Sequence, residues 1–330
     1  MLRSPDMEGI ITAWGKILRG YRPSLSIEIT RECPLRCPGC YAYGDEHLGG
    51  DINLRQVTDY KGQELIDRVI GIVDAENPIH VSIVGGEPLV RYKELNEILP
   101  KLAERGIYTQ VVTSAVRSIP IEWATIPRLQ MVVSIDGLQP EHDVRRTPAT
   151  YDRIHKHIAG QHITVHCTVT RQQVQRDGYL EEFARLWSEN PNVRQIWFSL
   201  YTPQIGEQSA EILTPHDRER VIAALMSLRK KYRKIAMPEG LVKQYGTPPD
   251  APDECIFAQT TSCISADFEH RITPCQFGGN PDCSQCGCIA SAGLMAVGAH
   301  RLPGGIRVGA IFETSFKIGR AMRNRREAVA

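Results

Sequence analysis

The sequence lacks several features that would assign it to a common class of protein. No apolar run approaches the roughly eighteen residues that a membrane-spanning helix needs, and no secretory signal peptide is recognisable. Neither sign of charge dominates, since 39 Lys and Arg residues face 38 Asp and Glu residues. This balance gives no reason to expect a nucleic-acid partner. We therefore expect a soluble, cytoplasmic protein whose 330 residues suffice for a main domain with an extension.

Cysteine, by contrast, is abundant, and it is clustered. Eight of the ten cysteines fall in two groups, at 33–40 and 263–288, and Cys255 lies just outside the second. Spacings of two to four residues are typical of metal sites rather than of a disulfide framework. The first group, Cys33-Pro-Leu-Arg-Cys37-Pro-Gly-Cys40, follows a strand-like run. Cubane iron–sulfur clusters are normally held by four cysteines, so three local thiolates leave one iron open. A structural zinc loop is the alternative.

A second motif, Gly85-Gly86-Glu87-Pro88, follows the apolar run 81–84. Glycine permits close backbone approach and positive φ, and proline ends the ladder of a strand. A polar ligand could therefore lie against bare backbone at the tip of this predicted strand. An ordinary strand-to-helix turn is the alternative for this motif taken alone.

Together the two motifs resemble those of the radical S-adenosylmethionine (SAM) enzymes. The resemblance implies that Cys33, Cys37 and Cys40 hold a [4Fe–4S] cluster, that SAM chelates the open iron, and that an electron from the cluster splits SAM into a 5′-deoxyadenosyl radical. It also implies that Gly85, Gly86, Glu87 and Pro88 meet the methionyl amino group of SAM, and that flavodoxin or ferredoxin supplies electrons. The family's usual aromatic residue before the third cysteine is Gly39 here. Tyr41 then becomes the nearest aromatic candidate for the adenine.

Strand-like and helix-like patterns alternate along the first 235 residues. The strands read as nearly continuous apolar runs, as in a parallel sheet that is covered on both faces. We predict an α/β fold, a partial (β/α)6 TIM-like barrel, which is also the fold of the resembled family. The chain after residue 235 does not supply the two further units that a full eight-stranded barrel would need. The predicted strands are 24–29, 80–84, 108–113, 129–135, 163–170 and 195–201, and the predicted helices are 55–75, 92–104, 150–158, 179–190 and 214–232.

Polar residues lie where these strands end, and parallel α/β folds bind ligands at such ends. Ser114 follows the third predicted strand, and Ser134 and Asp136 lie at the end of the fourth. The resemblance implies contacts from these residues to the ribose and amino-acid portions of SAM. Capping of the following turns is the alternative for both serines.

Arg146 closes the segment His142-Asp-Val-Arg-Arg146, which resembles the HDxxR segment of relatives with C-terminal cluster domains. Arginine suits bidentate binding of a carboxylate, so we expect Arg146 to hold the carboxylate of SAM. A surface ion pair with Asp143 or Glu141 is the alternative. Residues that could line a substrate space after the sixth strand, or merely pack there, are Tyr201, Thr202 and Gln204.

The second cysteine group resembles a SPASM or twitch extension, because Cys263-x11-Cys275 has the spacing of its opening hairpin. The resemblance implies one auxiliary [4Fe–4S] cluster. Four-cysteine zinc sites also use closely spaced pairs, so a zinc ribbon is the alternative. The predicted ligands are Cys263, Cys275, Cys283 and Cys286, with Cys288 and Cys255 in reserve.

These patterns divide the chain into an amphipathic segment 1–23, a barrel 24–235, a cysteine-rich extension 236–300 and a basic tail 301–330. Amphipathic and basic segments can bind a membrane surface, although packing on the barrel is more usual. Peripheral membrane contact is therefore a possibility for both termini.

The predicted function is reductive cleavage of SAM, followed by hydrogen abstraction from an unidentified substrate. The short stretch before the first strand leaves no room for the leader-binding module of many peptide-modifying relatives, so we expect a lipid, isoprenoid or small metabolite rather than a peptide. Radical addition to an alkene and maturation of a ribosomal peptide are the alternatives. A non-catalytic iron–sulfur or zinc scaffold is the alternative of another class. An apolar barrel lining would favour a lipid, and a polar or acidic one a peptide or sugar.

Overall fold

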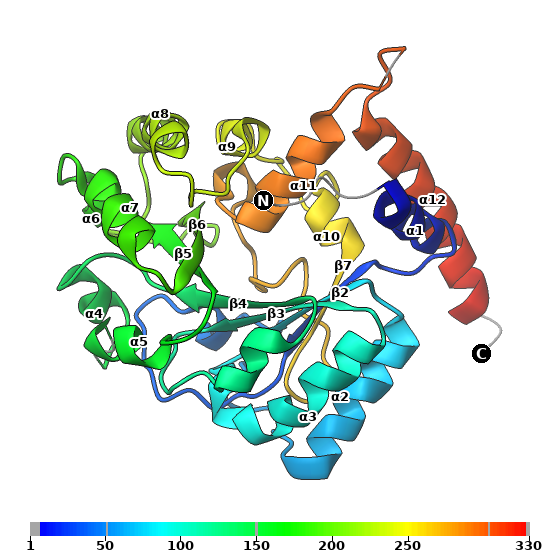
Figure 1. The fold of residues 1–330 in the computed structure, drawn as a ribbon. Coiled ribbons are helices and arrows are strands. Elements are labelled where there is room, and N and C mark those ends of the chain that lie inside the picture. Colours follow the sequence, from blue (N-terminus) through cyan, green and yellow to red (C-terminus); the bar gives the residue numbers. More distant parts are fainter. Residues whose placement is uncertain (1–6, 51, 149–150, 303, 328–330) are drawn as a thin grey trace.

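One parallel sheet of seven strands organises the chain, in the order β6-β5-β4-β3-β2-β1-β7 (Figure 1). This computed structural model describes residues 7–50, 52–148, 151–302 and 304–327. It confirms the predicted α/β class and the partial barrel. The strands are β1 (Ser24–Glu28), β2 (His80–Val84), β3 (Tyr108–Thr113), β4 (Leu129–Ser134), β5 (Ile163–Val169), β6 (Val193–Leu200) and β7 (Thr261–Ile264).

Helices connect the strands and cover one face of the sheet (Figure 1). Those between strands and after β6 are α2 (Gly62–Glu76), α3 (Tyr92–Glu104), α4 (Glu141–Arg145), α5 (Tyr151–His157), α6 (Arg171–Val174), α7 (Tyr179–Glu189), α8 (Pro215–Lys231), α9 (Glu239–Gln244) and α10 (Ile256–Thr260). The others are α1 (Met7–Leu18), α11 (Ile289–Ala299) and α12 (Val308–Glu327). The short 3-10 turns are η1 (Tyr41–Tyr43), η2 (Pro88–Arg91), η3 (Ile121–Thr125) and η4 (Cys283–Gln285).

The seventh strand is the main departure from the predicted fold. β7 pairs in parallel with β1, which places Cys263 beside Ser26, so the sheet has seven strands where six were predicted. Four residues, Thr-Ser-Cys-Ile, are too few and too polar to show a strand pattern, although all four are buried. After β7 the chain turns back, and the Ile272 amide donates to the Cys263 carbonyl at 2.9 Å. The hairpin predicted between Cys263 and Cys275 is therefore present at its start.

Helix α2 begins at Gly62, whereas the predicted helix begins at residue 55. The preceding segment is held instead by Asp59, whose carboxylate lies 2.5 Å from the Arg91 guanidinium and accepts from the Thr30 hydroxyl at 2.9 Å. These bonds draw residues 55–61 over the end of β1. Helix α8 agrees more closely, because Thr214 caps it in a capping box with Asp217.

The core lies between the sheet and the helices. Leu25 and Ile27 of β1 alternate with polar residues and pack in one buried cluster with Leu65 of α2 and Leu95 of α3. The residues that alternate with them, such as Ser26, therefore point to the opposite face of the sheet, away from these helices.

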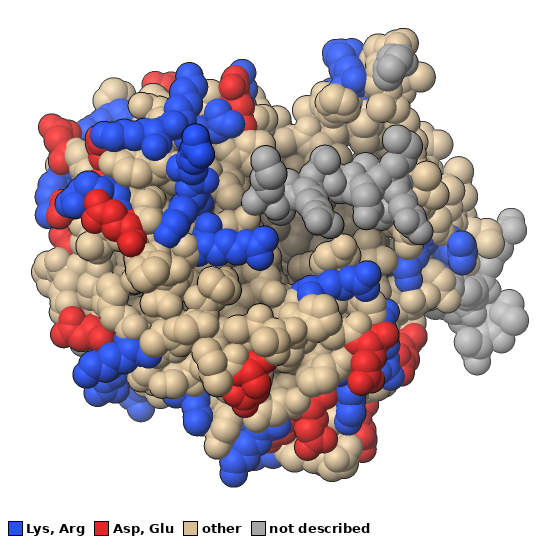
Figure 2. All heavy atoms as spheres, in the orientation of Figure 1, with Lys and Arg blue, Asp and Glu red and all other residues tan. Residues whose placement is uncertain are grey.

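The terminal helices α1 and α12 lie together at one side of the sheet (Figure 1). The Trp14 and Phe312 rings are 6.0 Å apart, and Ile17 is buried. The apolar faces of the two helices thus pack on protein. No helix in the described part of the chain combines the length and apolarity needed to cross a membrane. Residues 1–6, 303 and 328–330 of the predicted terminal segments lie outside the described residues. In Figure 2, acidic and basic side chains are interspersed over much of the visible face.

Candidate functional site

The three-cysteine loop follows β1 at the carboxyl edge of the sheet. Cys33, Cys37 and Cys40 are free and partly exposed. Main-chain bonds shape the loop: the Cys40 amide donates to the Cys37 carbonyl at 3.3 Å, and the Arg36 amide donates to the Thr147 carbonyl at 2.6 Å. Burial raises the pKa of the Cys33 thiol to about 12 and raises that of Cys40 as well. The Cys33 and Cys40 thiols therefore keep their protons until a metal displaces them.

The Gly85-Gly86-Glu87-Pro88 turn packs directly on the chain that leads into this loop. Gly86 N donates to the Thr30 carbonyl at 2.8 Å, and Glu87 N donates to the Glu32 carbonyl at 2.9 Å. Gly85 has φ +126°, and a Cβ there would lie 2.8 Å from the Thr30 carbonyl oxygen. A Cβ on Gly86 would lie 2.3 Å from the Glu32 carbonyl oxygen. Glycine is thus required because two backbones touch, and the bare side of the turn faces the cysteine loop.

Glu87 joins the ends of β2 and β3. Its buried carboxylate accepts from the Leu89 amide at 2.9 Å, from the Ser114 amide at 2.8 Å and from the Thr113 hydroxyl. Burial raises the pKa of this carboxyl despite these donors. The arrangement gives Glu87 a positioning role at the strand ends. The predicted contact between Glu87 and SAM stays a prediction.

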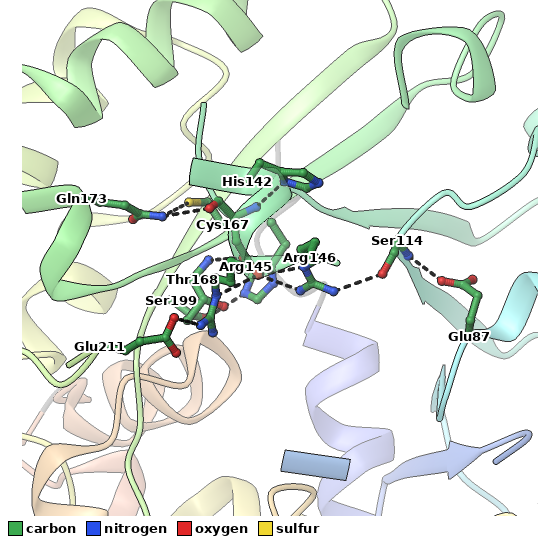
Figure 3. A network of polar contacts seen from close by, with 12 residues as sticks. Glu87, Ser114, His142, Arg145, Arg146, Cys167, Thr168, Gln173, Ser199 and Glu211 are labelled. Atoms are coloured by element: carbon green, nitrogen blue, oxygen red, sulfur yellow. Dashed lines mark hydrogen bonds and ion pairs between the residues drawn. The ribbon is translucent and has the colours of Figure 1, made fainter. Parts of the chain in front are cut away.

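A polar network that includes Ser114, Arg146 and Thr168 lies at the ends of β3, β4 and β5 (Figure 3). Asp136 is at its centre. Its carboxylate accepts from the Arg146 Nε at 2.8 Å, from the Arg145 Nε at 3.3 Å and from the Thr168 amide at 2.8 Å. Arg146 also donates to the Ser114 hydroxyl at 3.0 Å. Burial opposes ionisation of Asp136, but the two guanidiniums outweigh it and hold its pKa well below the usual range. The predicted residues Ser114, Asp136 and Arg146, from three separate segments of the chain, are thus joined by hydrogen bonds.

Arg146 pairs with Asp136, whereas the sequence suggested Asp143 or Glu141 as its surface alternative. The difference arises because α4 is only five residues long and its C-cap residue, Arg146, turns back toward the sheet. The residue after Arg146 contacts the cysteine loop, since the Arg36 amide donates to the Thr147 carbonyl. Arg146 therefore lies between the Asp136 network and the cysteine loop.

Arg145, His142 and Glu211 belong to this network but were not among the predicted site residues. Arg145 bridges Asp136 and Glu211, and the His142 ring accepts from the Asp136 amide at 3.1 Å. Burial lowers the pKa of His142 to about 4, so its ring is neutral at pH 7. His142 could have been found from its place in the HDxxR-like segment. Glu211 could not, because 66 residues separate it from Arg145.

Ser134 and Tyr41 occupy different surroundings. Ser134 is buried and lies beside His166 in the β4–β5 register. The Tyr41 ring contacts the Phe277 ring at 5.2 Å and the His47 ring at 5.8 Å. Tyr41 therefore bridges the first cysteine loop and the segment that carries the second group. The predicted adenine contact of Tyr41 stays a prediction.

The second cysteine group lines a cavity. Its walls include the thiols of five cysteines together with Phe257, Phe277 and Ser291, and the five are Cys255, Cys275, Cys283, Cys286 and Cys288. Cys255 Sγ lies 3.2 Å from Ser291 Oγ. Cys263, a predicted ligand, does not line this cavity but is buried on β7, and Cys255, held in reserve, does line it. Burial raises the pKa of Cys263 to about 12 and of Cys283 to about 11.

The five cysteines around this mostly apolar cavity are soft donors of the kind that hold an iron–sulfur cluster. Among the described residues, no group of three or more His, Cys, Asp or Glu side chains is arranged to hold a single metal ion. The identity of the group that these thiols bind stays a prediction.

Main-chain bonds fix the second cysteine segment to the end of β6. Leu200 N donates to the Gly287 carbonyl at 2.9 Å, and Gly287 N donates to the Thr202 hydroxyl at 2.9 Å. On the other side, His47 Nδ1 donates to the Phe277 carbonyl at 3.0 Å, and His47 Nε2 lies 2.8 Å from the buried carboxylate of Glu28. Both cysteine groups are thus held at the same edge of the sheet.

The residues after β6 bring acidic side chains to this edge. The Tyr201 hydroxyl donates to Glu207 at 2.5 Å, and Gln204 accepts from the Asn280 amide at 2.6 Å. A Cβ on Gly39 would lie 3.3 Å from the Tyr201 hydroxyl and 3.5 Å from a Glu211 oxygen. The segment therefore approaches the cysteine loop, as expected for a wall of the substrate space.

The sheet face turned away from the helices is polar. Gln110 donates to the Ser82 hydroxyl at 3.0 Å. On the neighbouring strands Gln130 donates to the Thr164 hydroxyl at 2.8 Å. Strand register and alternation place further polar members on this face, namely Ser26, His166, Gln195 and Ser199. The inside of the partial barrel therefore carries hydroxyl, amide and imidazole groups, with Val84, Val112, Val132 and Trp197 on the same face.

This chain is similar to known proteins both in sequence and in fold. Residues 27–165 match the radical SAM superfamily. The PqqA peptide cyclase of Methylobacterium sp. (strain 4-46) is 33% identical over 92 residues, which are 28% of this chain and 22% of that relative. The chain thus matches less than a third of the length of its curated relatives.

Two solved structures share the fold. Streptococcus suis SuiB bound to precursor peptide SuiA has a TM-score of 0.57 at 17% identity, covering 84% of this chain and 66% of that chain. Native anSMEcpe with bound AdoMet has a TM-score of 0.54 at 18% identity, covering 77% of this chain and 75% of that chain. At these identities the likeness concerns the fold.

Proposed function

We propose that this chain cleaves SAM reductively and modifies a peptide by a radical reaction, because residues 27–165 match the radical SAM superfamily. Cys33, Cys37 and Cys40 would hold a [4Fe–4S] cluster, which when bound supplies the electron that splits SAM into methionine and a 5′-deoxyadenosyl radical. The observation that carries this proposal is the contact between the Gly85-Gly86 turn and the segment that enters the cysteine loop, since it joins the two motifs into one site.

The protein would hold SAM through the groups gathered at the strand ends. Arg146, which is partly exposed, would bind the SAM carboxylate, since its guanidinium is a planar fork of donors. Ser114 and Asp136 keep that fork in place. Ser134 would contact the ribose. The Glu87 carboxylate and the backbone of 85–88 would face the amino group.

The peptide assignment replaces the lipid or small metabolite that we expected from the sequence. The curated relatives are named peptide cyclases, and the solved structure of SuiB contains a precursor peptide. The barrel lining of this chain supports the same substrate class. Gln110, Gln130 and Gln195 each offer both a donor and an acceptor, which suits amide groups and does not suit an isoprenoid chain.

The second cysteine cavity would hold one auxiliary [4Fe–4S] cluster, with ligands drawn from the five cysteines that line it. Its place beside Tyr41 and the end of β6 puts it at the edge of the barrel where the substrate would react. Such a cluster could exchange an electron with the substrate radical. An external carrier such as flavodoxin or ferredoxin would reduce the first cluster.

The test is an anaerobic assay of the whole chain. After reconstitution with iron and sulfide, a low-potential reductant and SAM are added, and 5′-deoxyadenosine is quantified. The Cys33→Ala/Cys37→Ala/Cys40→Ala variant should form none. The matched control is Cys167→Ala, a buried core thiol outside both groups, which should form as much as the parent.

Absence of 5′-deoxyadenosine from a parent protein that demonstrably holds iron and sulfide would refute SAM cleavage. The substrate class is tested in the same assay. A pool of short peptides should stimulate 5′-deoxyadenosine formation and disappear as it is modified. Stimulation by an isoprenoid alone would refute the peptide assignment while leaving SAM cleavage intact.

A further inference from the structure

Arg218 occupies an unusual position in the first turn of α8. The amino end of a helix carries a partial positive charge, so a cation there is electrostatically unfavourable. Its side chain leaves the helix and reaches the second cysteine segment. Arg218 Nη1 donates to the Tyr245 carbonyl at 2.7 Å and to the Cys286 carbonyl at 3.2 Å, and Nη2 donates to the Gln285 carbonyl.

All three of these hydrogen bonds end on neutral main-chain carbonyl oxygens. A partly buried guanidinium without a carboxylate partner is costly, because burial removes water that would otherwise stabilise its charge. The Asp282 carboxylate is already occupied by Ser284 and Gln285. The Arg218 guanidinium therefore lies on the turn that carries Cys283 and Cys286, two of the cysteines that line the cavity.

We propose that Arg218 is the fixed counter-charge of the auxiliary cluster and raises its reduction potential. This inference rests on the proposed function, since it requires that the second cavity holds an iron–sulfur cluster. A cluster held by thiolates is negatively charged and gains one further negative charge on reduction. A fixed cation beside it stabilises the reduced state more than the oxidised state.

The same side chain also has a geometric effect. By bonding two successive carbonyls, at Gln285 and Cys286, it holds the turn that carries the Cys283 and Cys286 thiols against α9 and α8. A test must therefore separate the charge of Arg218 from its role in shaping this turn.

The experiment uses the full chain with Cys33→Ala, Cys37→Ala and Cys40→Ala, so that the auxiliary cluster is the one cluster present. Its midpoint potential is measured by anaerobic redox titration followed by electron paramagnetic resonance. Adding Arg218→Gln should move the potential to more negative values. Arg218→Lys keeps the charge, so its potential should stay close to that of the parent. The matched control is Arg220→Gln, two residues along α8, whose exposed guanidinium pairs with Asp177 at 2.9 Å.

An unchanged potential in Arg218→Gln, with iron and sulfide content equal to the parent, would overturn the proposal. An equal shift in Arg218→Gln and Arg218→Lys would also overturn it, because the clamp on the carbonyls and not the charge would then set the potential. Uptake of zinc in place of iron and sulfide would remove the cluster on which the proposal depends. SAM cleavage is measured separately, as 5′-deoxyadenosine formed by the chain with all its cysteines, so its failure is distinguishable.

Discussion

Replacing Gly86 by Ala tests the contact that joins the two motifs of the site. An Ala Cβ would lie 2.3 Å from the Glu32 carbonyl oxygen and 2.6 Å from the Tyr43 hydroxyl. The Glu32 carbonyl would have to retreat by roughly 0.7 Å, from 2.3 to 3.0 Å, and it is backbone rather than the end of a flexible side chain. Glu32 directly precedes Cys33, so this retreat displaces the first cluster ligand.

The expected cost follows from overpacking, which destabilises a protein by about 1–3 kcal/mol. Metal–ligand distances tolerate only about ±0.2 Å. A retreat of roughly 0.7 Å is therefore tolerated by the fold but exceeds the tolerance of the cluster's metal–ligand distances. We expect Gly86→Ala to stay folded, with a modestly lowered free energy of unfolding in urea. Its iron and sulfide content at the first site and its 5′-deoxyadenosine yield should both fall several-fold.

Gly71→Ala is the matched control, since a Cβ at this position in α2 meets nothing within 4 Å. Ala is favoured over Gly inside a helix, so this variant should gain about 0.5–1 kcal/mol and form a normal amount of 5′-deoxyadenosine. The reasoning is refuted if Gly86→Ala loads iron and cleaves SAM like the parent, because the turn and the cysteine loop would then not depend on this contact.

Three further predictions concern charge, pH and ligation. Asp136→Asn leaves Arg145 and Arg146 without their shared carboxylate and should lower the free energy of unfolding by about 3–5 kcal/mol. The exposed control Asp152→Asn should change this free energy little. Equal effects of the two substitutions in urea denaturation would contradict the role of the buried network. Burial lowers the pKa of His142 from 6.5 to about 4, so the unfolded chain binds more protons than the folded chain between these pH values. The free energy of unfolding should therefore fall as the pH drops from 6.5 towards 4. His142→Gln should reduce this dependence of unfolding on pH, and an unchanged dependence would count against a neutral buried ring. Cys275→Ser, in the cavity wall, should abolish iron binding at the second site while Cys263→Ser on β7 retains it; the reverse result by iron analysis would restore the ligand set expected from the sequence.

The local patterns of the sequence predicted most elements of the fold. β2, α3 and β3 have the bounds that apolar spacing predicts, because their periodicity depends only on which residues face the core. The pattern did not predict β7 as a strand of the sheet, because its four residues contain only one aliphatic side chain and gain their strand conformation from pairing with β1. Conversely, residues 55–61 were predicted as helix and form a loop, since Asp59 bonds to Arg91 and Thr30.

The sequence by itself also determined which chemistry is available, because closely spaced cysteines and the Gly85–Pro88 turn carry their spacing in a few consecutive residues. Only the tertiary structure decided which groups meet. It brought Glu211 to Arg145, Arg218 to Cys286 and Cys255 into the second cavity, across separations that no local pattern records. It also decided the character of the barrel lining, since the polarity of one sheet face emerges only when alternating residues of several strands are aligned by parallel register.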